Sequence, residues 1–311
     1  MANERIAVLG AGLMGHGIAQ IFAAGGHQVA LYDLSEAVLN SAPERIRAIF
    51  TLLEQDPADA KNVRLELDFA KAVADADLVI EAAPEKLPIK QDIFARLEAA
   101  TKRDAILASN TSALPITKIA EKVETADRVV GTHFWNPPHL IPLVEVVQAE
   151  RTSLATVRKT MAMLAAVGKS PVHVKRDVPG FIGNRLQHAM KREAIAIVAA
   201  GICDAETLDT VVKDGFGGRL GILGPMEQSD LIGVNITLDV QRTMCPAIDN
   251  STAPHPLLVE MVEKGQLGMS TGKGFYEWTP EKAAAVRKRV NEQLVEQARA
   301  RAKKRAKERT S

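Results

Sequence analysis

Three glycines near the start of the chain have the spacing needed to hold a phosphate group against the backbone. Gly10, Gly12 and Gly15 form a G-x-G-x-x-G pattern between the apolar run "IAVL" and a stretch of helical spacing. The first glycine permits a tight turn, the second leaves room for a pyrophosphate, and the third allows close helix–strand packing. The helix N-terminus adds free N–H groups and partial positive charge. The pattern predicts a dinucleotide site, with a purely structural turn as the alternative.

An acidic residue follows at the distance that such a site requires. Asp33 ends a second apolar run, "HQVALYD", eighteen residues after Gly15. In dinucleotide-binding folds a carboxylate at this place accepts hydrogen bonds from the adenosine ribose and repels the extra phosphate of NADP. We therefore predict NAD as the cofactor. The alternative is that Asp33 caps the next helix.

Polar side chains also end the strands that must position the site. Strand-like segments cover 76–84, 105–112, 128–135 and 143–149, with helical stretches such as 89–101 between the earlier ones. This rhythm predicts an α/β fold with a doubly wound, mostly parallel Rossmann-like sheet, where ligands bind beyond the carboxyl ends of the strands. The polar residues at or just after these ends are Glu85, Ser109, Asn110, Ser112, His133 and Asn136. We expect them to share one crevice.

Composition bounds the class of protein. The 311 residues, 46% of them apolar, are enough for two domains with a substantial core. A net charge of +1 gives no reason to expect nucleic acid or a membrane surface as a partner. Cys203 and Cys245 lie far apart, so we expect no disulfide framework and no metal site. With no apolar run near the ~20 residues of a membrane span and no signal sequence, a cytoplasmic protein is expected.

A change of pattern near residue 178 divides the chain. Strand patterns fade there and helical patterns dominate, which predicts a NAD-binding domain at 1–178 and an all-helical domain at 179–311. The tail from residue 283 is alanine-rich and strongly basic. It is interpreted first as a solvated C-terminal helix that frays, and second as a basic patch that attracts an anionic group.

Several longer motifs carry a family resemblance over nearly the whole chain. They are "PEKLPIK", "SNTSALPITKIA", "GTHFWNPPHLIPLVEVV", "DVPGFIGNRL", "GPMEQSDLIG" and "STGKGFYEW", in that order. Together they resemble the 3-hydroxyacyl-CoA dehydrogenase family. The resemblance implies an NAD-dependent oxidoreductase acting on CH–OH groups, with a helical C-terminal domain for substrate binding and homodimer formation.

The resemblance also implies four catalytic residues. His133 is the base that takes the hydroxyl proton, and a histidine pKa near ~6.5 suits that step. Glu145 would fix the tautomer of His133, and a carboxylate in the apolar strand "LVEVV" is costly unless it is paired. Ser112 and Asn184 would hydrogen-bond the substrate oxygen. The structural alternatives are that Ser112 caps a helix and that Asn184 lies mid-helix by chance.

Cofactor contacts follow from the fingerprint and the resemblance together. Glu85, Lys90 and Asn136 match family positions that contact NAD, although Lys90 is also readable as a solvated helix charge. The full predicted set is Gly10, Gly12, Leu13, Met14, Gly15, Asp33, Glu85, Lys90, Asn110 and Asn136.

The substrate is the open question. For a family member a CoA thioester such as 3-hydroxybutyryl-CoA, in fatty-acid metabolism, ranks narrowly first. The segment 34–74 is shorter than the arm that CoA-using members employ, and it has few lysines for a polyphosphate. This favours the alternative of a free hydroxy acid or ring alcohol, such as gulonate, carnitine or a pyridoxine-degradation intermediate. Two departures from the family pattern are Ser270, in place of a frequent lysine, and His139, a candidate contact for a substrate carboxylate.

Two other classes of protein remain as alternatives. A catalytically silent NADH-binding structural protein would not need all of Ser112, His133, Glu145 and Asn184, and the chain has all four. A redox-sensing regulator would need a DNA-reading element, and no helix-turn-helix signal is evident.

Overall fold

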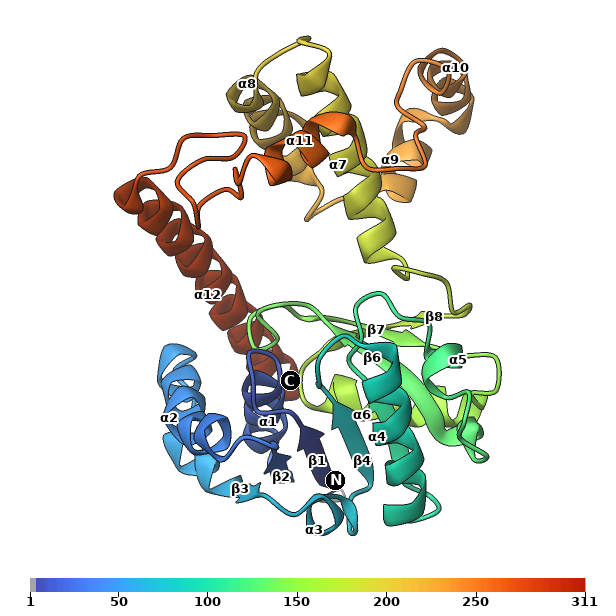
Figure 1. Ribbon diagram of the computed structural model, residues 1–311, viewed down its shortest axis with the longest axis vertical. Coiled ribbons are helices and arrows are strands. Elements are labelled where there is room, and N and C mark those ends of the chain that lie inside the picture. Colours follow the sequence, from blue (N-terminus) through green and yellow to red (C-terminus); the bar gives the residue numbers. More distant parts are fainter. Residues whose placement is uncertain (1–3, 311) are drawn as a thin grey trace. The chain divides into compact units, whose positions relative to one another are not determined.

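The structure is a computed structural model that describes residues 4–310, without the side chains of 306 and 308–310. The chain divides into two compact units, Met1–Asn184 with Val290–Ser311, and Arg185–Arg289. The sheet and the helices that cover its two faces belong to the first unit, and the second is helical (Figure 1). None of the helices in the described part of the chain could cross a membrane.

The sheet of the first unit has eight strands in the order β3-β2-β1-β4-β5-β6-β7-β8. All neighbouring strands pair in parallel except β6 and β7, so the predicted doubly wound, mostly parallel sheet is confirmed. The strands are β1 (Arg5–Leu9), β2 (Gln28–Tyr32), β3 (Val63–Glu66), β4 (Leu78–Glu81), β5 (Ile106–Ser109), β6 (Val129–Phe134), β7 (Leu143–Val147) and β8 (Ser170–Val174).

The connection from β6 to β7 explains the single antiparallel pair. Only residues 135–142 join the two strands, which is too short for the crossover helix that a parallel pair requires. The antiparallel register sets His133 directly opposite Glu145. Two residues predicted to act together are therefore cross-strand neighbours.

Among the described residues, six α-helices belong wholly to the first unit and pack on the sheet. The strands β1, β4, β5 and β6 are therefore almost entirely buried. These helices are α1 (Gly15–Ala24), α2 (Glu36–Leu52), α3 (Phe69–Val73), α4 (Leu87–Ala100), α5 (Ile116–Ile119) and α6 (Leu154–Ala166). The remaining helices are α7 (Gly183–Ala199), α8 (Ala205–Thr210), α9 (Pro225–Ile232), α10 (Val234–Met244), α11 (Pro256–Glu263) and α12 (Pro280–Thr310).

The basic tail forms the predicted helix but is not simply solvated. Its last part, from Val290, belongs to the first unit, so the helical segment 179–311 is not a single compact body. Val295 is buried, and Arg299 donates to the carbonyl of Leu52 at the end of α2. An apolar contact and these hydrogen bonds hold α12 in place, whereas a run of charge alone predicted a fraying helix; Ser311 lies outside the described residues.

Candidate active site

The three glycines of the β1–α1 turn have different surroundings. Gly10 has a φ of +101°, and a Cβ there would lie 2.7 Å from the Ala82 carbonyl oxygen. A Cβ on Gly15 would lie 1.6 Å from the Gly10 carbonyl oxygen, whereas a Cβ on Gly12 would meet nothing within 4 Å. Gly10 and Gly15 are thus required by packing, and Gly12 leaves open space at the N-terminus of α1. These residues fit the pyrophosphate of NAD.

Asp33 lies just beyond β2 and faces this turn. Its carboxylate accepts hydrogen bonds from the Ala11 N–H at 2.7 Å and the Ser35 N–H at 2.8 Å. Ser35 is the residue that caps α2, accepting from the Val38 N–H. The alternative reading of Asp33 as a helix cap is therefore wrong. Each carboxylate oxygen keeps a lone pair for a ribose hydroxyl.

His133 and Glu145 form a buried acid–base pair. Nδ1 of His133 lies 2.8 Å from Oε2 of Glu145, and the two residues are 5% and 1% exposed. Because an ionised carboxylate only accepts, the shared hydrogen is carried by Nδ1 and the lone pair by Nε2. Trp135 and Phe181 flank the imidazole, with ring centroids 5.5 and 5.6 Å away. The pair can take a proton from a substrate hydroxyl at Nε2.

The second oxygen of Glu145 holds the start of α7. Oε1 accepts from the N–H groups of Ile182 and Gly183, both at 2.9 Å. Burial raises the pKa of Glu145, but the bonds from His133, Gly183 and Ile182 outweigh it and hold the pKa below its ordinary value. The carboxylate therefore stays ionised. It also fixes the helix turn that carries Asn184.

A second set of bonds organises the turn after β5. Oε1 of Glu85 accepts from the Thr111 hydroxyl at 2.5 Å and from the N–H groups of Ser112 and Ala113 at 3.0 and 3.2 Å. Asn184 donates from Nδ2 to the Ser112 carbonyl at 2.9 Å. Asn184 is the second residue of α7, and α5 begins only at Ile116. The alternatives of a mid-helix Asn184 and a helix-capping Ser112 are therefore wrong.

Lys90 is buried beneath Glu85. Its side chain is 1% exposed, and Nζ donates to Glu81 at 2.7 Å and pairs with Glu85 at 3.4 Å. Lys90 is therefore not a solvated helix charge, and its ion pair helps to hold the Glu85 side chain in place. The pKa of Glu85 is below its ordinary value because its hydrogen bonds and Lys90 outweigh the effect of burial.

Two residues of this hydrogen-bond network, Glu81 and Thr111, were not predicted from the sequence. Glu81 is fully buried, and it accepts from Lys90 and from the Ser109 hydroxyl at 2.6 Å. Thr111 binds Glu85 and accepts from the Leu114 N–H. An acid inside the apolar run "LVIEAAP" was the available signal for Glu81, the same signal that marked Glu145.

Four predicted cofactor contacts remain: Asn110, Asn136, Leu13 and Met14. Asn110 accepts from the Phe134 N–H at 2.9 Å, which ties the ends of β5 and β6 together. Asn136 is exposed just after β6, and Leu13 is 68% exposed beside Gly12, with the half-buried Met14 next to it. That these four contact a bound nucleotide stays a prediction.

His139 and Ser270 are the two departures from the family pattern. His139 packs beside Gly17, and burial together with His16 and Lys169 lowers its pKa to about 4. A ring that is neutral at physiological pH offers no ion pair to a substrate carboxylate, which argues against that expectation. Ser270 is exposed in the helical unit.

A Rossmann-like sheet with this glycine turn and a buried histidine–carboxylate pair defines an NAD-dependent dehydrogenase. Residues 5–178 match the family description "3-hydroxyacyl-CoA dehydrogenase, NAD binding domain", and residues 180–278 match "3-hydroxyacyl-CoA dehydrogenase, C-terminal domain". The chain belongs to the 3-hydroxyacyl-CoA dehydrogenase family, whose members are NAD-dependent oxidoreductases acting on CH–OH groups.

Relatives of two kinds resemble the chain in sequence. It is 36% identical over 297 residues to 5-formyl-3-hydroxy-2-methylpyridine 4-carboxylate 5-dehydrogenase of Mesorhizobium japonicum, covering 94% of this chain and 96% of the relative. It is 35% identical over 282 residues to 3-hydroxybutyryl-CoA dehydrogenase of Clostridioides difficile, covering 88% and 99%. The family thus includes relatives named for a CoA thioester and for a free acid.

Solved structures show the same two kinds. The crystal structure of the 5-formyl-3-hydroxy-2-methylpyridine 4-carboxylic acid 5-dehydrogenase, described as an NAD⁺-dependent dismutase, matches with a TM-score of 0.88 and 34% identity, covering 97% of this chain and 99% of the other. The (S)-3-hydroxybutyryl-CoA dehydrogenase of Ralstonia eutropha matches with a TM-score of 0.73 and 30% identity, covering 89% and 100%.

Proposed function

We propose that the protein is an NAD-dependent dehydrogenase whose substrate is a small free acid bearing a hydroxyl, or the corresponding carbonyl compound in the reverse direction, and not a CoA thioester. The observation that carries this proposal is that few basic side chains in the arm between β2 and β3 are available to bind a phosphate. The acid–base machinery supports the reaction class, and the arm supports the choice of substrate.

His133 acts as the general base. As the hydride leaves the carbinol carbon, the hydroxyl proton passes to Nε2, and the carbon–oxygen single bond becomes a double bond. Glu145, bonded to Nδ1, stabilises the imidazolium that results. The glycine turn would hold NAD⁺, which would supply the hydride acceptor for this step.

Ser112 and Asn184 position the substrate oxygen. Both are neutral donors, so they can stabilise charge on that oxygen without taking the proton from His133. The Ser112 main chain is held by Glu85, and Asn184 follows the α7 turn held by Glu145. Two carboxylates that do not touch substrate therefore fix the geometry of the residues that do.

The arm between β2 and β3 is poorly suited to a polyphosphate ligand. It holds the one α-helix α2 and a short 3-10 turn at Pro57–Asn62. Arg45 donates to the Ala11 carbonyl at 2.8 Å, and Arg64, on β3 just after the arm, pairs with Glu66 at 3.0 Å. Arg47 and Lys61 remain, whereas a CoA moiety carries several phosphate charges that call for basic partners.

The comparison structures support the same choice. The relative named for a pyridine carboxylate matches 97% of this chain, and the 3-hydroxybutyryl-CoA dehydrogenase matches 89% with a lower TM-score. By its name the former acts on a formyl group of a ring that carries a carboxylate. A substrate of this chemistry needs no adenosine phosphate pocket.

A CoA thioester is the second candidate, because the family name and the relative from Clostridioides difficile favour it. The deciding experiment measures NADH formation with 3-hydroxybutyryl-CoA, free 3-hydroxy acids, and pyridine carboxylates bearing hydroxymethyl or formyl groups. We expect kcat/KM for the best free acid to exceed that for the thioester by at least about tenfold. Turnover confined to the thioester would refute the substrate while leaving the reaction class intact.

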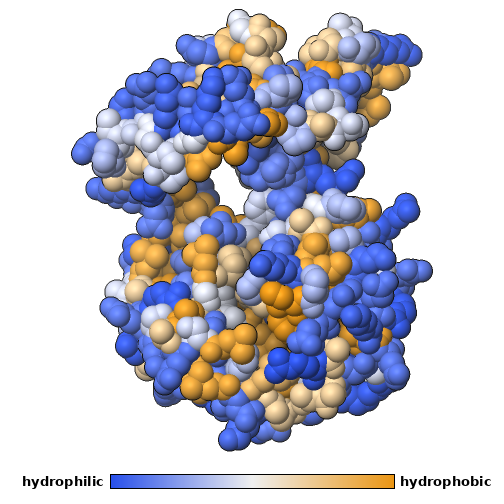
Figure 2. Space-filling model, viewed as in Figure 1, coloured by the Kyte–Doolittle hydropathy of each residue, from blue (hydrophilic) through white to orange (hydrophobic). Residues whose placement is uncertain are grey.

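We also propose a homodimer in a reducing cytoplasm. Large apolar side chains are exposed in the helical unit, among them Ile222, Met226 and Leu231 at 87%, 73% and 73%, and apolar surface is visible around α10 (Figure 2). Exposed apolar surface of this kind is typical of an interface. Both cysteines are free, as a reducing compartment keeps them. Light scattering should give twice the chain mass.

A further inference from the structure

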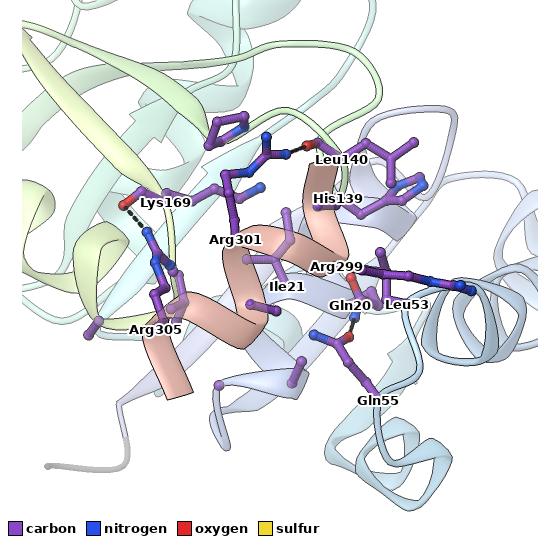
Figure 3. A pocket seen from close by; sticks show the side chains of 18 residues that line it. Gln20, Ile21, Leu53, Gln55, His139, Leu140, Lys169, Arg299, Arg301 and Arg305 are labelled. Atoms are coloured by element: carbon purple, nitrogen blue, oxygen red, sulfur yellow. Dashed lines mark hydrogen bonds between the residues drawn. The ribbon is translucent and has the colours of Figure 1, made fainter. Parts of the chain in front are cut away.

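The first unit has a cavity whose lining includes no residue of the glycine turn or of the His133–Glu145 pair. It has a volume of about 360 Å³ and is bounded by α1, the loop after β6, the end of α6 and the last part of α12 (Figure 3). Its basic side chains are Lys169, Arg299, Arg301 and Arg305. The proposed reaction uses none of them. We call this space the basic cavity.

Three of these cations have no acidic partner among the lining residues that the structure describes. Lys169 is 7% exposed, and its Nζ donates to the carbonyls of Pro138 and Ile141. Arg301 donates to the Leu140 carbonyl at 2.6 Å, and Arg305 donates to the Lys169 carbonyl at 3.3 Å. All of these acceptors are neutral. Among the lining residues that the structure describes there is no aspartate or glutamate, and Glu54 pairs with Arg299 at 2.8 Å.

Burial and mutual repulsion both disfavour the charged forms of these side chains. Burial, and then repulsion by Arg301 and Arg305, lowers the pKa of Lys169 to about 7. Burial and Arg305 also lower the pKa of Arg301. Cations gathered out of water repel one another unless an anion is present. The cavity supplies the positive charge and the space for one.

The donors indicate which anion fits. Each guanidinium carries five N–H donors, and Arg301 and Arg305 each use one in a bond to a main-chain carbonyl. Planar guanidinium groups bind phosphoryl and carboxylate oxygens through paired hydrogen bonds. Two arginines with a lysine offset a dianion better than a single carboxylate. Ile21 and Leu53 add apolar wall beside the charged corner, which leaves room for an organic group.

We propose that the basic cavity is a binding site for a phosphoryl group, supplied by inorganic phosphate or by a small organic phosphate, and held by Lys169, Arg301 and Arg305. The site is separate from the dehydrogenase site and does not depend on the substrate proposed above.

The test is isothermal titration calorimetry of the NADH-saturated protein at constant ionic strength, so that the dinucleotide site is occupied. The probes are inorganic phosphate, phenyl phosphate and sulfate. We expect one saturable site, weakened by at least about tenfold in the double variant Arg301→Gln/Arg305→Gln. The matched control is Arg287→Gln, an exposed arginine of α12 that does not line the cavity, and it should bind like the unchanged protein.

Phenyl phosphate distinguishes the source of the phosphoryl group. Tighter binding than inorganic phosphate assigns the site to an organic phosphate, and equal or weaker binding assigns it to the inorganic ion. The proposed site would be overturned if neither inorganic phosphate nor phenyl phosphate saturated the protein up to ~10 mM. Equal phosphate affinity in the double variant and the control variant would also overturn it.

A second measurement needs no substitution. The groups facing Lys169 are Arg301 and Arg305 from α12 and His139 from the loop after β6. Because burial and the two arginines lower the pKa of Lys169 to about 7, an anion bound beside Lys169 at pH 8 favours its ammonium form. Sulfate itself does not titrate at this pH, so its binding should be accompanied by net proton uptake by the protein, measured by calorimetry in buffers of different ionisation enthalpy. Binding without proton uptake would overturn the assignment of Lys169 to this site.

Discussion

Glu145 decides which nitrogen of His133 can act as a base. Its Oε2 accepts from Nδ1 of His133, and Trp135 donates to the same oxygen at 3.3 Å. Its Oε1 accepts from the N–H groups of Ile182 and Gly183, at the start of α7. One side chain thus sets a tautomer and the start of a helix together. A buried carboxylate bonded on both oxygens is stable because each of its lone-pair directions finds a donor.

His133→Ala should lower kcat by about 10² to 10⁴, the usual contribution of a positioned general base, while NADH binding changes by less than about twofold. Steady-state kinetics and fluorescence titration with NADH measure the two quantities. His173→Ala is the matched control, because His173 lies on β8 and bonds Gln148. Equal turnover in the two variants would refute the role of His133.

Glu145→Gln should show how the carboxylate links pH to stability. The folded pKa lies below the ordinary value of 4.5, so ionised Glu145 stabilises the fold above that pH. That contribution is lost as the pH falls through the folded pKa. We therefore expect the free energy of unfolding to be higher in the unchanged protein than in the variant at pH 7, with the gap narrowing below pH 4.5.

Urea unfolding across this pH range measures the gap. Glu150→Gln, at an exposed residue after β7, serves as the control and should show little difference at any pH. A gap for Glu145→Gln that stays constant with pH would contradict the ionised, hydrogen-bonded state of the carboxylate.

At the scale of elements, the β1–α1 turn offers a pair of matched substitutions. Gly15→Ala places a Cβ 1.6 Å from the Gly10 carbonyl oxygen, so the turn cannot keep its shape and both stability and NADH binding should fall. Gly12→Ala meets no protein atom within 4 Å, so the fold should keep its melting temperature. It should still lose NADH affinity, because its Cβ occupies the space left for the pyrophosphate.

Calorimetric melting and NADH titration separate the two effects. If Gly12→Ala bound NADH as well as the unchanged protein, the pyrophosphate would not lie over this glycine.

Central elements were predictable from the sequence and the edge elements were not. β1, β2, β4, β5, β6 and β7 are buried apolar runs that can be recognised by composition alone. β3 and β8 are the outer strands of the sheet, half-exposed, and β8 contains Pro171 at an edge position where proline is tolerated. Such strands leave no continuous apolar signal.

The site was predictable only in part, for a related reason. His133, Glu145, Ser112 and Asn184 carry recognisable motifs. Glu145 is held by the N–H groups of residues 182 and 183, and Ser112 by Glu85, which Thr111 and Lys90 hold in turn. Such partners depend on the tertiary structure. No local sequence pattern predicts that Lys90 is buried and paired with Glu81 and Glu85 instead of solvated.

At the scale of the whole molecule, the end of the chain returns to the first unit. Composition correctly predicted a basic helix, but charge alone could not say which carbonyls its arginines would meet. Arg299 binds the carbonyl of Leu52 and pairs with Glu54, and Arg301 binds that of Leu140. These contacts tie the end of α2 and the loop after β6 to residues more than a hundred positions away.

A chain ending at Arg289 should therefore melt earlier than the full chain. Hydrogen bonds from charged donors contribute about 1.5–3 kcal/mol each when well formed, and these arginines are only half-buried, so we expect a loss on the order of 3 kcal/mol. For a folded unit of this size that lowers the melting temperature by about 6–12 °C. Differential scanning calorimetry of the two chains measures the shift. Equal melting of the two chains would mean that this part of α12 adds nothing to the stability of the first unit.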